Sequence, residues 1–589
     1  MSNAEMARLL EQFGDLSEIA GENFFKVRAY RNAAAALLEL SEPVEAMVKA
    51  GKPLTDIDGV GKEIALKLTE LATTGRLPQL EELAQEVPVG LIELTRVKGV
   101  GPKLVQTLWK ELSITSVEAL EEAAKEGRLV GLPGIGAKKQ EAILKGIEAY
   151  HRHVGRTRIG EADAVVEPLL ARLREVKGVK RVEVAGSYRR RRESIGDIDL
   201  LAVPSTKSGA KEVTRAFVEY AEVSEVLGSG ETRSSVRLAN GIQADLRVIE
   251  EESFGAALMY FTGSKAHNVA LRQRALDQGL HLSEYGLFEG GASAATPATP
   301  GAAGKLVAGR TEGEVYERLG LDWVPPELRE DRGELAAAVA HELPDLITPG
   351  DVRGDLHMHS TWSDGKSTLE EMFDACAQRG YEYLAITDHS QALAMTGGLD
   401  EAKLARQWQE LDEVLKGRED VTVLRGMEVD ILKDGSLDLS DEWLERLDIV
   451  LISVHSYFDL SQAEQTARVV KAVSHPAVNV LAHPTGRVLG ERDPYAIDLT
   501  AVFDACLASG VAVEHNCSYQ RLDLSDVNLI AARERGLTIS AGSDAHSTQQ
   551  LATMRYGVDQ MRRAWLTKSD VLNARPLKEV RAFLAKGRT

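Results

Sequence analysis

Carboxylates and arginines gather in one stretch of the chain, residues 186–201, whose sequence is GSYRRRRESIGDIDLL. Asp197 and Asp199 stand two residues apart in an apolar run, so a strand there places both side chains on one face. Gly186 and Ser187 follow another short predicted strand, where free backbone N–H groups suit phosphate oxygens. Together with the arginines that follow, this stretch has the groups that a two-metal nucleotidyl-transfer site needs.

A third carboxylate stands in a later strand pattern. Residues 241–248 read GIQADLRV, with Asp245 near the centre. Alternating acids on a single strand are as often a solvated face as a metal site. Because the arginine-rich stretch and a second acidic strand occur together, we interpret Asp197, Asp199 and Asp245 as a cluster that binds two divalent cations, Mg²⁺ or Mn²⁺.

Histidines and carboxylates gather in the second half of the chain, each after a short apolar run. These runs cover residues 383–387, 421–424, 449–454, 478–482, 511–514 and 538–541, and amphipathic segments separate them. Such alternation predicts a parallel barrel or sheet, whose functional side chains follow the C-terminal ends of the strands. The polar residues at these positions are His357, His359, Asp364, His389, Glu428, His455, His483, Asp544 and His546.

A lone histidine is more often part of the surface or of a satisfied core than a metal ligand. Here most of the 13 histidines occur at predicted strand ends, with carboxylates between them. Imidazole and carboxylate ligands without thiolate suit zinc, manganese or iron in a hydrolytic site. His515 also follows a strand, and its role stays open between support of this site and packing.

The first 150 residues predict helices throughout, because Ala, Leu and Glu recur with amphipathic spacing. Within them the pattern hydrophobic-Gly-hydrophobic-Gly occurs three times before a helix-forming run. Its glycines are Gly59 and Gly61, Gly99 and Gly101, and Gly134 and Gly136. A single turn of this kind usually does no more than connect two helices. Three copies, which resemble the helix-hairpin-helix motif, favour binding to DNA phosphates through backbone N–H groups.

Lys67 lies in the helix after the first of these turns, and a basic aromatic segment precedes it at residues 24–31. A solvated basic helix face accounts for this pattern by itself. The alternative is an amine that forms a Schiff base with an abasic sugar aldehyde. Spacing alone favours the first interpretation.

Composition limits the class of protein. With 589 residues the chain is long enough for several domains, and its formal charge of −20 argues against tight non-specific binding to a polyanion outside local patches. Three isolated cysteines fit a reducing compartment, and no apolar run approaches the ~18 residues that span a bilayer. We therefore predict a cytoplasmic protein with no membrane partner. The sequence leaves the oligomeric state open, and we favour a monomer.

The motifs of the first half, taken in order, resemble those of family X DNA polymerases, the class that includes polymerase beta. They are GSYRR and GDIDLL around the first two aspartates, ADLR around the third, and YFTGS with Asn268 and Arg272 downstream. This resemblance covers roughly residues 1–325. The HxH, TDH and SDAH motifs of the second half resemble the polymerase and histidinol phosphatase (PHP) family of metal phosphoesterases, over about residues 350–575.

The first resemblance implies a role for each matching residue. Asp197 and Asp199 would bind both metals, and Asp245 would complete the catalytic-metal site. Gly186, Ser187, Arg190 and Gly196 would hold the incoming triphosphate, Tyr260, Phe261 and Gly263 would line the sugar pocket, and Asn268 and Arg272 would touch the nascent base pair and template. Lys67 matches the lyase nucleophile.

The second resemblance implies up to three ions, Zn²⁺ or Mn²⁺. One would take His357, His359, Glu428 and Asp544, a second Glu428, His455 and His483, and a third Asp364, His389 and His546. Glu428 would then bridge two metals. All nine positions are filled, so we expect an active centre.

Four positions depart from the family pattern. Gln243 stands where better-known members have an arginine beside the third aspartate, and Lys265 and His267 replace an acidic and an aromatic residue of the nucleotide pocket. These three departures affect the expected efficiency and fidelity of nucleotide incorporation. Glu63 replaces a lysine that supports the lyase nucleophile, which bears on lyase activity.

The predicted architecture is multidomain. It comprises an all-α lyase-like domain with one helix-hairpin-helix (1–82), a helical fingers domain with two (83–155), an α+β nucleotidyltransferase palm (156–255), a nucleotide-selection subdomain (256–325), a linker (326–348) and a C-terminal α/β PHP domain with a distorted TIM-like barrel (349–589). An Ala/Thr/Pro/Gly stretch at residues 290–304 predicts a flexible loop.

These expectations lead to one predicted function and two alternatives. We predict a DNA polymerase that fills short gaps during repair, using gapped or primed DNA and deoxynucleoside triphosphates, with a metal-dependent 3'-5' exonuclease or phosphoesterase in the PHP domain. The first alternative is a DNA-targeted PHP nuclease or phosphatase with a weak or vestigial palm. The second, a non-catalytic module that binds DNA ends, leaves both ligand sets unexplained.

Overall fold

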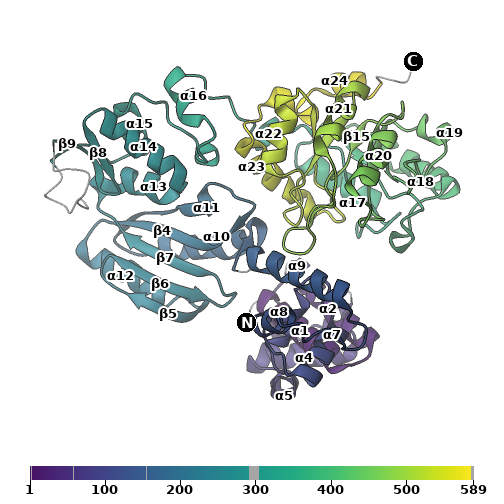
Figure 1. Ribbon diagram of the computed structural model, residues 1–589, viewed down its shortest axis with the longest axis horizontal. Helices are drawn as coiled ribbons and strands as arrows, with labels where there is room; N and C mark the ends of the chain where they lie inside the picture. Colours follow the sequence, from purple (N-terminus) through teal and green to yellow (C-terminus); the bar gives the residue numbers. More distant parts are fainter. Residues whose placement is uncertain (2, 41, 58, 154, 291–303, 586–589) are drawn as a thin grey trace. The chain divides into compact units, whose positions relative to one another are not determined.

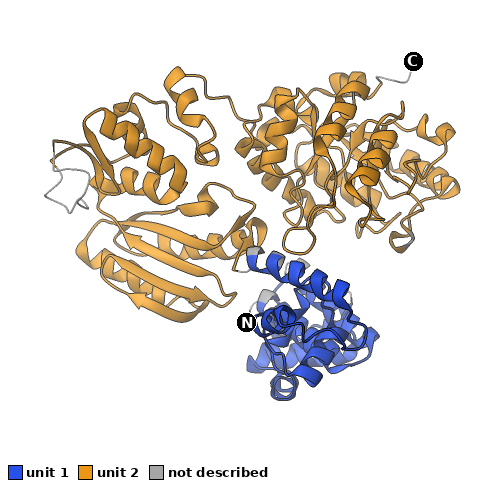
Figure 2. Ribbon diagram, viewed as in Figure 1, with its two compact units in different colours: residues 1–154 blue, residues 155–589 orange. Residues whose placement is uncertain are grey.

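The computed structural model describes every residue except 2, 41, 58, 154, 291–303 and 586–589. The described chain forms two units, residues 1–154 and 155–589 (Figure 2). The stretch expected to be a flexible loop, residues 290–304, lies almost wholly outside the described residues. No described helix combines the length and the apolar composition needed to cross a bilayer.

The first unit is helical, as its amphipathic spacing predicts. Its helices are α1 (Asn3–Ala20), α2 (Phe24–Glu39), α3 (Val44–Lys49), the short η1 (Leu54–Asp56), α4 (Lys62–Thr74), α5 (Pro78–Glu86), α6 (Leu91–Thr95), α7 (Pro102–Leu112), α8 (Val117–Lys125) and α9 (Ala137–His153). Their apolar faces share one core that runs from Met6 to Ile147. The expected boundary between residues 82 and 83 falls inside this core, so the division into two helical domains stays a prediction.

A five-stranded sheet organises the start of the second unit. Its strands are β2 (Val179–Val184), β4 (Asp197–Pro204), β7 (Gln243–Val248), β6 (Arg233–Leu238) and β5 (Val223–Ser229), in that spatial order. Strands β4 and β7 run parallel, and the other neighbours are antiparallel. The short elements β1 (Thr157–Arg158), α11 (Gly186–Arg189) and β3 (Ser194–Ile195) flank it.

The two faces of this sheet differ in chemistry because side chains alternate along each strand. Helices α10 (Ile159–Arg174) and α12 (Lys207–Val218) pack on one face, against residues that include Ile198 and Leu200 (Figure 1). Residues at the odd positions of β4 therefore face the other way, and this second face carries Asp197 and Asp199.

Helices and a small sheet follow the five-stranded sheet. They are η2 (Glu251–Ser253), α13 (Phe254–Thr262), α14 (Lys265–Asp277), α15 (Glu312–Arg318) and the antiparallel strands β8 (Leu280–Ser283), β9 (Gly286–Glu289) and β10 (Lys305–Ala308). Helix α13 packs on the acidic face of the five-stranded sheet, where Ala257 and Leu258 meet Leu201 and Val203. This contact brings α13 beside the aspartates.

The segment expected to be a linker, residues 326–348, is packed against these helices. It contains η3 (Pro326–Leu328) and α16 (Glu334–Ala340). Arg329 is fully buried and donates hydrogen bonds to both carboxylate oxygens of Glu312, at 2.7 and 3.1 Å. A buried charge is tolerated only with such a partner. Since Glu312 lies in another helix, the spacing within residues 326–348 gives no sign of this pairing.

Seven parallel strands form the C-terminal domain, each paired with the next. They are β11 (Gly354–Asp355), β12 (Tyr383–Ile386), β13 (Thr422–Asp430), β14 (Ile449–Ser453), β15 (Val480–Leu481), β16 (Ala512–Asn516) and β17 (Ile539–Gly542). The helices around them are α17 (Leu369–Gln378), α18 (Glu401–Val414), α19 (Asp441–Leu444), α20 (Gln462–Val473), α21 (Leu499–Ser509), α22 (Asp526–Glu534), α23 (Met554–Arg563) and α24 (Leu577–Leu584), with short turns η4 (Pro349–Asp351), η5 (Ala394–Thr396), η6 (Gln550–Thr553), η7 (Lys568–Asp570) and η8 (Leu572–Ala574).

The first and last strands of this sheet approach each other, so the sheet is a nearly closed barrel. The Asn573 side chain fills the gap, because its Nδ2 donates to the carbonyl oxygens of Gly354 and Ala541 at 2.6 and 2.9 Å. Beyond the strands, Met358 pairs with Ala545 as a parallel bridge. The predicted fold class, with helical N-terminal region and TIM-like C-terminal barrel, is confirmed.

Candidate active sites

The three predicted aspartates lie on two neighbouring strands of the five-stranded sheet. Asp199 of β4 stands directly opposite Asp245 of β7 in the parallel register, and Asp197 is paired with Gln243. Because the three acidic residues occupy odd positions, their side chains share the face that α13 covers. The structure thus brings the three carboxylates together from segments more than 40 residues apart in the sequence.

The close approach of these carboxylates changes their acidity. Burial raises the pKa of Asp199 to about 6, and the negative charges of Asp197 and Asp245 add to the shift. Burial also acts to raise the pKa of Asp245, but hydrogen bonds from Ser235, Gln243 and Arg233 outweigh it and hold this pKa below its usual value. Asp199 is therefore the carboxylate that most needs a cation.

Metal affinity at the aspartates should fall in mild acid. Only the ionised carboxylate of Asp199 binds a cation, and its pKa of about 6 lies within an accessible range. We expect the apparent affinity for Mg²⁺ to be constant above pH 7 and to fall by about tenfold per pH unit below 6, since one proton then competes with the metal. Isothermal titration of full-length protein at pH 5.0 to 8.0 measures this, and Asp199→Asn should remove the dependence. A flat profile in the unaltered protein would contradict it.

Arg233 supplies a positive charge beside the third aspartate. The family pattern has an arginine for this purpose at the position of Gln243. Its Nη2 lies 3.2 Å from Asp245 Oδ1, although it comes from the neighbouring strand β6. Gln243 donates to the other oxygen of Asp245 at 2.8 Å. The departure at Gln243 therefore leaves a guanidinium at the third aspartate. The sequence did not identify Arg233, because its position depends on the register of β6 against β7, which places Arg233 across from Arg247.

Gly186 and Ser187 open the short helix α11 directly after β2. A Cβ at position 186 would lie 2.6 Å from Asp199 Oδ2, and the φ angle of Gly186 is +64°, so only glycine fits beside this carboxylate. Gly196 precedes β4 at the same end of the sheet. The two glycines and Ser187 thus lie next to the aspartates, as a phosphate-binding turn requires.

The arginine run after Ser187 is largely paired with carboxylates. Arg189 contacts Glu312 through two hydrogen bonds of 2.7 and 2.8 Å, and Arg190 Nε donates to Glu330 at 3.1 Å. Arg191 binds Asp559 of α23 at 2.7 Å. Arg190, expected to hold a triphosphate, therefore has to exchange Glu330 for phosphate oxygens, and this role stays a prediction.

The residues expected around the sugar and base come together at the junction of α13 and α14. Asn268 Nδ2 donates to the Tyr260 carbonyl at 2.6 Å, and the Arg272 guanidinium lies 5.6 Å from the centre of the Tyr260 ring. The Phe261 ring stacks on Arg247, at 4.2 Å, and so connects α13 with the strand of the third aspartate. Gly263 ends α13 with a φ of +71°.

His267 lies outside the lining of this junction. It is completely buried, with Nδ1 2.6 Å from Glu334 Oε1 and Nε2 2.8 Å from the Tyr316 hydroxyl. Burial lowers its pKa, which fits a neutral imidazole. The departure from the family pattern at this position therefore changes the packing of α14 against α15 and α16, whereas Lys265 is exposed.

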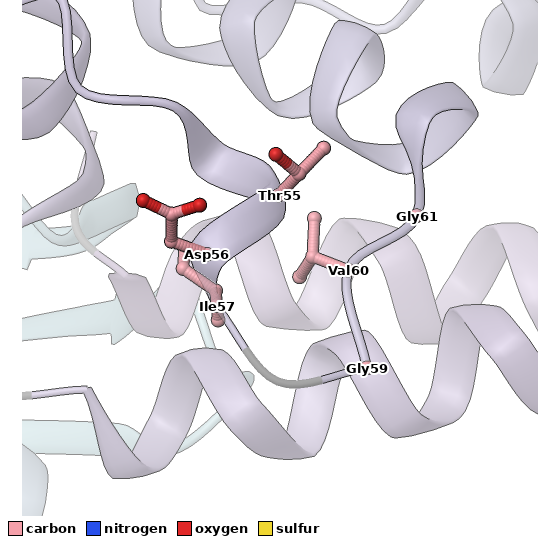
Figure 3. Close-up of a pocket in the computed structure, with 6 residues that line it drawn as sticks. All are labelled: Thr55, Asp56, Ile57, Gly59, Val60 and Gly61. Atoms are coloured by element: carbon pink, nitrogen blue, oxygen red, sulfur yellow. The ribbon is translucent and has the colours of Figure 1, made fainter.

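The three glycine turns of the first unit have one geometry. Gly59, Gly99 and Gly134 have φ angles of +74°, +88° and +78°, and the residue after each donates a hydrogen bond to the carbonyl three positions earlier. The second glycine of each turn precedes a helix, α4, α7 or α9. Figure 3 shows the first turn, where Gly59, Val60 and Gly61 line an open hollow. At Gly61, Gly101 and Gly136 an added Cβ would meet no atom within 4 Å, so ligands can approach the backbone.

Lys67 is held by the residue that departs from the family pattern. Its Nζ is 3.2 Å from Glu63 Oε1, which also accepts a hydrogen bond of 2.9 Å from the Tyr30 hydroxyl. The amine also lies over the Phe13 ring, 5.6 Å from its centre. An ion pair with Glu63 occupies the amine that a lyase reaction would use, and the lyase role of Lys67 remains a prediction.

Glu428 occupies the centre of the histidine cluster at the C-terminal ends of the barrel strands. Its Oε1 is 2.8 Å from His483 Nε2 and 3.4 Å from His455 Nε2. Its Oε2 is 2.9 Å from His389 Nδ1 and 3.4 Å from His357 Nε2. One buried carboxylate thus contacts imidazoles from four other segments, as a bridging ligand would.

Two aspartates complete the cluster. Asp544 Oδ1 lies 3.2 Å from His359 Nε2 and 3.6 Å from His357 Nε2. Asp364 Oδ1 lies 3.3 Å from His546 Nε2 and 3.7 Å from His389 Nε2. All nine side chains that the sequence indicated therefore lie in one cluster.

Three sets of ligand atoms are close enough to hold an ion each. They are His357, His359 and Asp544; His389, Glu428 and His455; and His359, Asp364, His389 and His546. The first contains three of the four expected ligands, and the third contains its expected ligands with His359 added. The second has His389 in the place of His483, which itself contacts Glu428.

The donor atoms fit divalent cations. Within the described chain, the buried atoms Glu428 Oε2 and His389 Nδ1 have no well-aligned hydrogen-bond partner, and His357 Nε2 and His359 Nε2 lie only 3.2 Å apart. Burial lowers the pKa of His359 to about 3, with the charges of His546 and His389 adding to the shift. This imidazole is therefore neutral, as metal ligation requires. Imidazole and carboxylate without thiolate suit Zn²⁺ or Mn²⁺.

A second layer of polar residues orients the ligands. Glu514 Oε1 lies 2.5 Å from His357 Nδ1, and its Oε2 accepts a hydrogen bond of 2.7 Å from the backbone N–H of His483. Asn516 Nδ2 donates to Asp544 Oδ2 at 3.0 Å. His515, between them on β16, points to the opposite side and contacts the Leu524 carbonyl at 3.0 Å, so its role is packing. Carboxylate partners of this kind fix the tautomer of a metal-bound imidazole.

Loss of the Glu514 carboxylate should weaken metal binding. In Glu514→Gln the amide keeps the size of the side chain but removes the charge that stabilises His357. We expect metal affinity at the barrel to fall roughly 10- to 100-fold, the usual effect of such second-layer changes. Competition with a chelator, followed by metal analysis, measures it. Glu534→Gln, at the end of α22, is the control, and equal affinity in both variants would contradict the assignment.

Comparisons with known proteins match several regions of the chain. The family model described as DNA polymerase beta thumb matches residues 257–330, and the PHP domain model matches residues 355–503. The helix-hairpin-helix domain and SAM-like helix-hairpin-helix tandem models match residues 1–77 and 91–149. These matches fall in four of the five predicted domains, which are the lyase-like, fingers, nucleotide-selection and PHP domains.

Relatives extend the similarity to the whole chain. A Bacillus subtilis protein named DNA polymerase/3'-5' exonuclease PolX is 36% identical over 588 residues, which cover 100% of both chains. DNA polymerase lambda of Rattus norvegicus is 25% identical over 344 residues, 56% of each chain. A probable phosphatase of Syntrophotalea carbinolica is 28% identical over 241 residues, which cover 39% of this chain and 95% of the relative.

Proposed function

The chain belongs to the family X DNA polymerases that carry a C-terminal PHP domain, and from this premise we propose that it fills short gaps in DNA and removes nucleotides from 3' ends. The observation that carries the proposal is the presence of two separate ligand sets in one unit. Three carboxylates meet on β4 and β7, and nine predicted ligands meet at the C-terminal ends of the barrel strands.

Polymerisation is assigned to the five-stranded sheet. Asp197, Asp199 and Asp245 would hold two cations, Mg²⁺ or Mn²⁺, which supply positive charge to the reacting phosphate. The turn at Gly186 and Ser187 would bind the triphosphate beside them. The primer 3'-oxygen would attack the α-phosphate, a new phosphodiester bond would form and pyrophosphate would leave. Tyr260 and Phe261 would line the sugar pocket, and Asn268 and Arg272 both contact Tyr260.

Hydrolysis is assigned to the barrel. The nine ligands would hold up to three ions, Zn²⁺ or Mn²⁺, whose chemistry there is Lewis-acid activation of a phosphodiester. Glu428 would bind more than one of them, and Glu514 and Asn516 would keep His357 and Asp544 in place. The expected product is a deoxynucleoside monophosphate released from a 3' end.

DNA is the proposed partner of the first unit. The open turns at Gly61, Gly101 and Gly136 leave the backbone accessible to phosphates, without groups that would read bases. Affinity should be modest and fall with salt, since the net charge is −20. We also propose a cytoplasmic location, which three buried free thiols support, and a monomeric state.

One experiment tests both activities. A 5'-labelled primer on a duplex with a one-nucleotide gap is incubated with the protein and Mn²⁺, with and without deoxynucleotides. Extension with nucleotides and shortening without them is the expected result. Shortening alone would instead support a PHP nuclease with an inactive palm, and Arg233 beside Asp245 argues against that alternative. No change in either condition would overturn the proposal.

A further inference from the structure

Two arginines at the mouth of the barrel have no role in the sites described above. Arg521 lies in the loop after β16, and its Nε is 3.4 Å from Asp544 Oδ2. That oxygen already accepts the amide of Asn516 at 3.0 Å. The Nη1 of Arg521 is buried and has no hydrogen-bond partner within the described chain. A guanidinium has five N–H donors, so the contact with Asp544 leaves most of its binding capacity free.

Arg492 lies in the loop after β15. Its Nε donates to the Gly486 carbonyl at 2.7 Å, and its guanidinium lies 4.4 Å from the centre of the Phe458 ring. Burial lowers its pKa, and the positive charge of Arg521 adds to the shift. The loops that carry the two arginines are joined by a hydrogen bond of 2.7 Å from the Leu489 N–H to the Gln520 carbonyl, one residue before Arg521. An anion bound by both guanidinium groups would offset their like charges.

We propose that Arg521 and Arg492 form a phosphate-binding subsite beside the metal ligands. The ligand class is the phosphate group of a DNA 3' end or of the nucleotide released from it. Guanidinium groups bind phosphate oxygens through paired, charge-assisted hydrogen bonds. Arg521 has the buried unpaired nitrogen and the contact with Asp544, so it binds the phosphate that is being hydrolysed, and Arg492 adds charge from the next loop. The inference rests on the proposed 3'-5' hydrolysis.

The loops that carry both arginines are fixed by the five-stranded sheet region. Leu489 and Leu522, one from each loop, belong to the same hydrophobic cluster as Ile159 of α10. The Leu489 carbonyl accepts a hydrogen bond of 2.8 Å from Arg158, and the Leu489 N–H donates to the Gln520 carbonyl at 2.7 Å. The subsite is thus held in position before substrate arrives, as efficient binding of a transition state requires.

The test uses full-length protein with Arg521→Gln. We expect kcat/KM for removal of 3' nucleotides from a 5'-labelled single-stranded oligonucleotide to fall roughly 10- to 100-fold, as expected for a lost charged hydrogen bond. The inhibition constant of inorganic phosphate should rise by about tenfold. Gap filling and the bound Zn²⁺ or Mn²⁺ should be unchanged. Arg521→Lys, which keeps the charge without the paired donors, should be intermediate.

Arg535→Gln is the matched control, because Arg535 is also a partly exposed arginine of the barrel but donates to the carbonyl of Ala531 in its own helix. If Arg521→Gln keeps the wild-type rate and phosphate inhibition, the inference is wrong. It is equally wrong if the loss of activity follows a loss of metal, since Arg521 would then only support Asp544. If unaltered protein shows no hydrolysis, the proposed function fails by itself. Calorimetric binding of inorganic phosphate to the zinc-loaded protein then decides the inference, and equal affinity in both proteins would overturn it.

Discussion

Glu428→Gln is expected to abolish removal of 3' nucleotides while gap filling continues at the wild-type rate. The carboxylate contacts His483 at 2.8 Å and His389 at 2.9 Å and is completely buried. Glu428→Gln removes a ligand that more than one proposed ion would share, so we expect the rate of hydrolysis to fall by about 10³-fold, the scale of loss when key charge stabilisation of a transition state is removed.

The acidity of Glu428 supports this expectation. Burial acts to raise its pKa, but the charges of His389, His455 and His357 outweigh burial and hold the pKa well below its usual value. Glu428 therefore carries its negative charge at neutral pH. A neutral amide of the same size changes only this charge, so the packing at the centre of the barrel stays the same.

The measurement is the rate of shortening of a 5'-labelled oligonucleotide, together with primer extension and metal analysis on the same preparation. Glu445→Gln, at the exposed end of α19, is the control. Retention of hydrolysis in Glu428→Gln would show that the cluster is not the hydrolytic site. Loss of gap filling as well would show that the two sites are not separate.

The strand patterns explain why the ligands of the barrel could be predicted from sequence. Functional side chains of parallel barrels follow the strands, and six of the seven strands here, β12 to β17, are marked by an apolar run. The alternation also resolves His515, which the sequence left open. Glu514 and Asn516 are two residues apart and point inward, so the residue between them must point outward to the helices.

Long-range pairing explains what the sequence could not show. The arginine run after Ser187 indicated phosphate binding, yet Arg189 pairs with Glu312, 123 positions away, and Arg191 with Asp559, 368 positions away. No local pattern reports such partners. Arg233 was missed for the same reason, since its contact with Asp245 depends on the register of β6 against β7.

Contacts between the five-stranded sheet region and the barrel also could not be predicted from the sequence. Arg487, four residues after the ligand His483, binds Glu193 at 2.7 Å, and Gln560 of α23 donates to the Arg191 carbonyl at 2.8 Å. Both partners on the sheet side, Arg191 and Glu193, lie between Ser187 and Asp197. The expected division into independent domains thus omits a set of polar contacts that joins the segment preceding the aspartates to the barrel.

Asp197→Ala combined with Asp199→Ala is expected to abolish gap filling and to leave 3' hydrolysis unchanged. The pair supplies two of the three carboxylates, so neither cation would be held, and we expect the extension rate to fall by at least about 10³-fold, the scale of loss when key charge stabilisation of a transition state is removed. Extension of a gapped primer and shortening of an oligonucleotide, measured on one preparation, give both rates. Glu225→Ala, on the exposed strand β5, is the control. Residual extension near the wild-type rate would contradict the assignment.

The same carboxylates should also lower stability when no metal is bound. The pKa of Asp199 is raised from 3.8 to about 6, so the folded state binds this proton more tightly than the unfolded chain. Stability is therefore lost as the pH rises from about 4 through 6, by on the order of 3 kcal/mol. In EDTA at pH 7.5, Asp199→Asn should raise the unfolding temperature while it abolishes gap filling, and at pH 4 the two proteins should unfold together. An unchanged unfolding temperature at pH 7.5 would contradict the expectation that burial and the neighbouring carboxylates make ionised Asp199 unfavourable in the absence of metal.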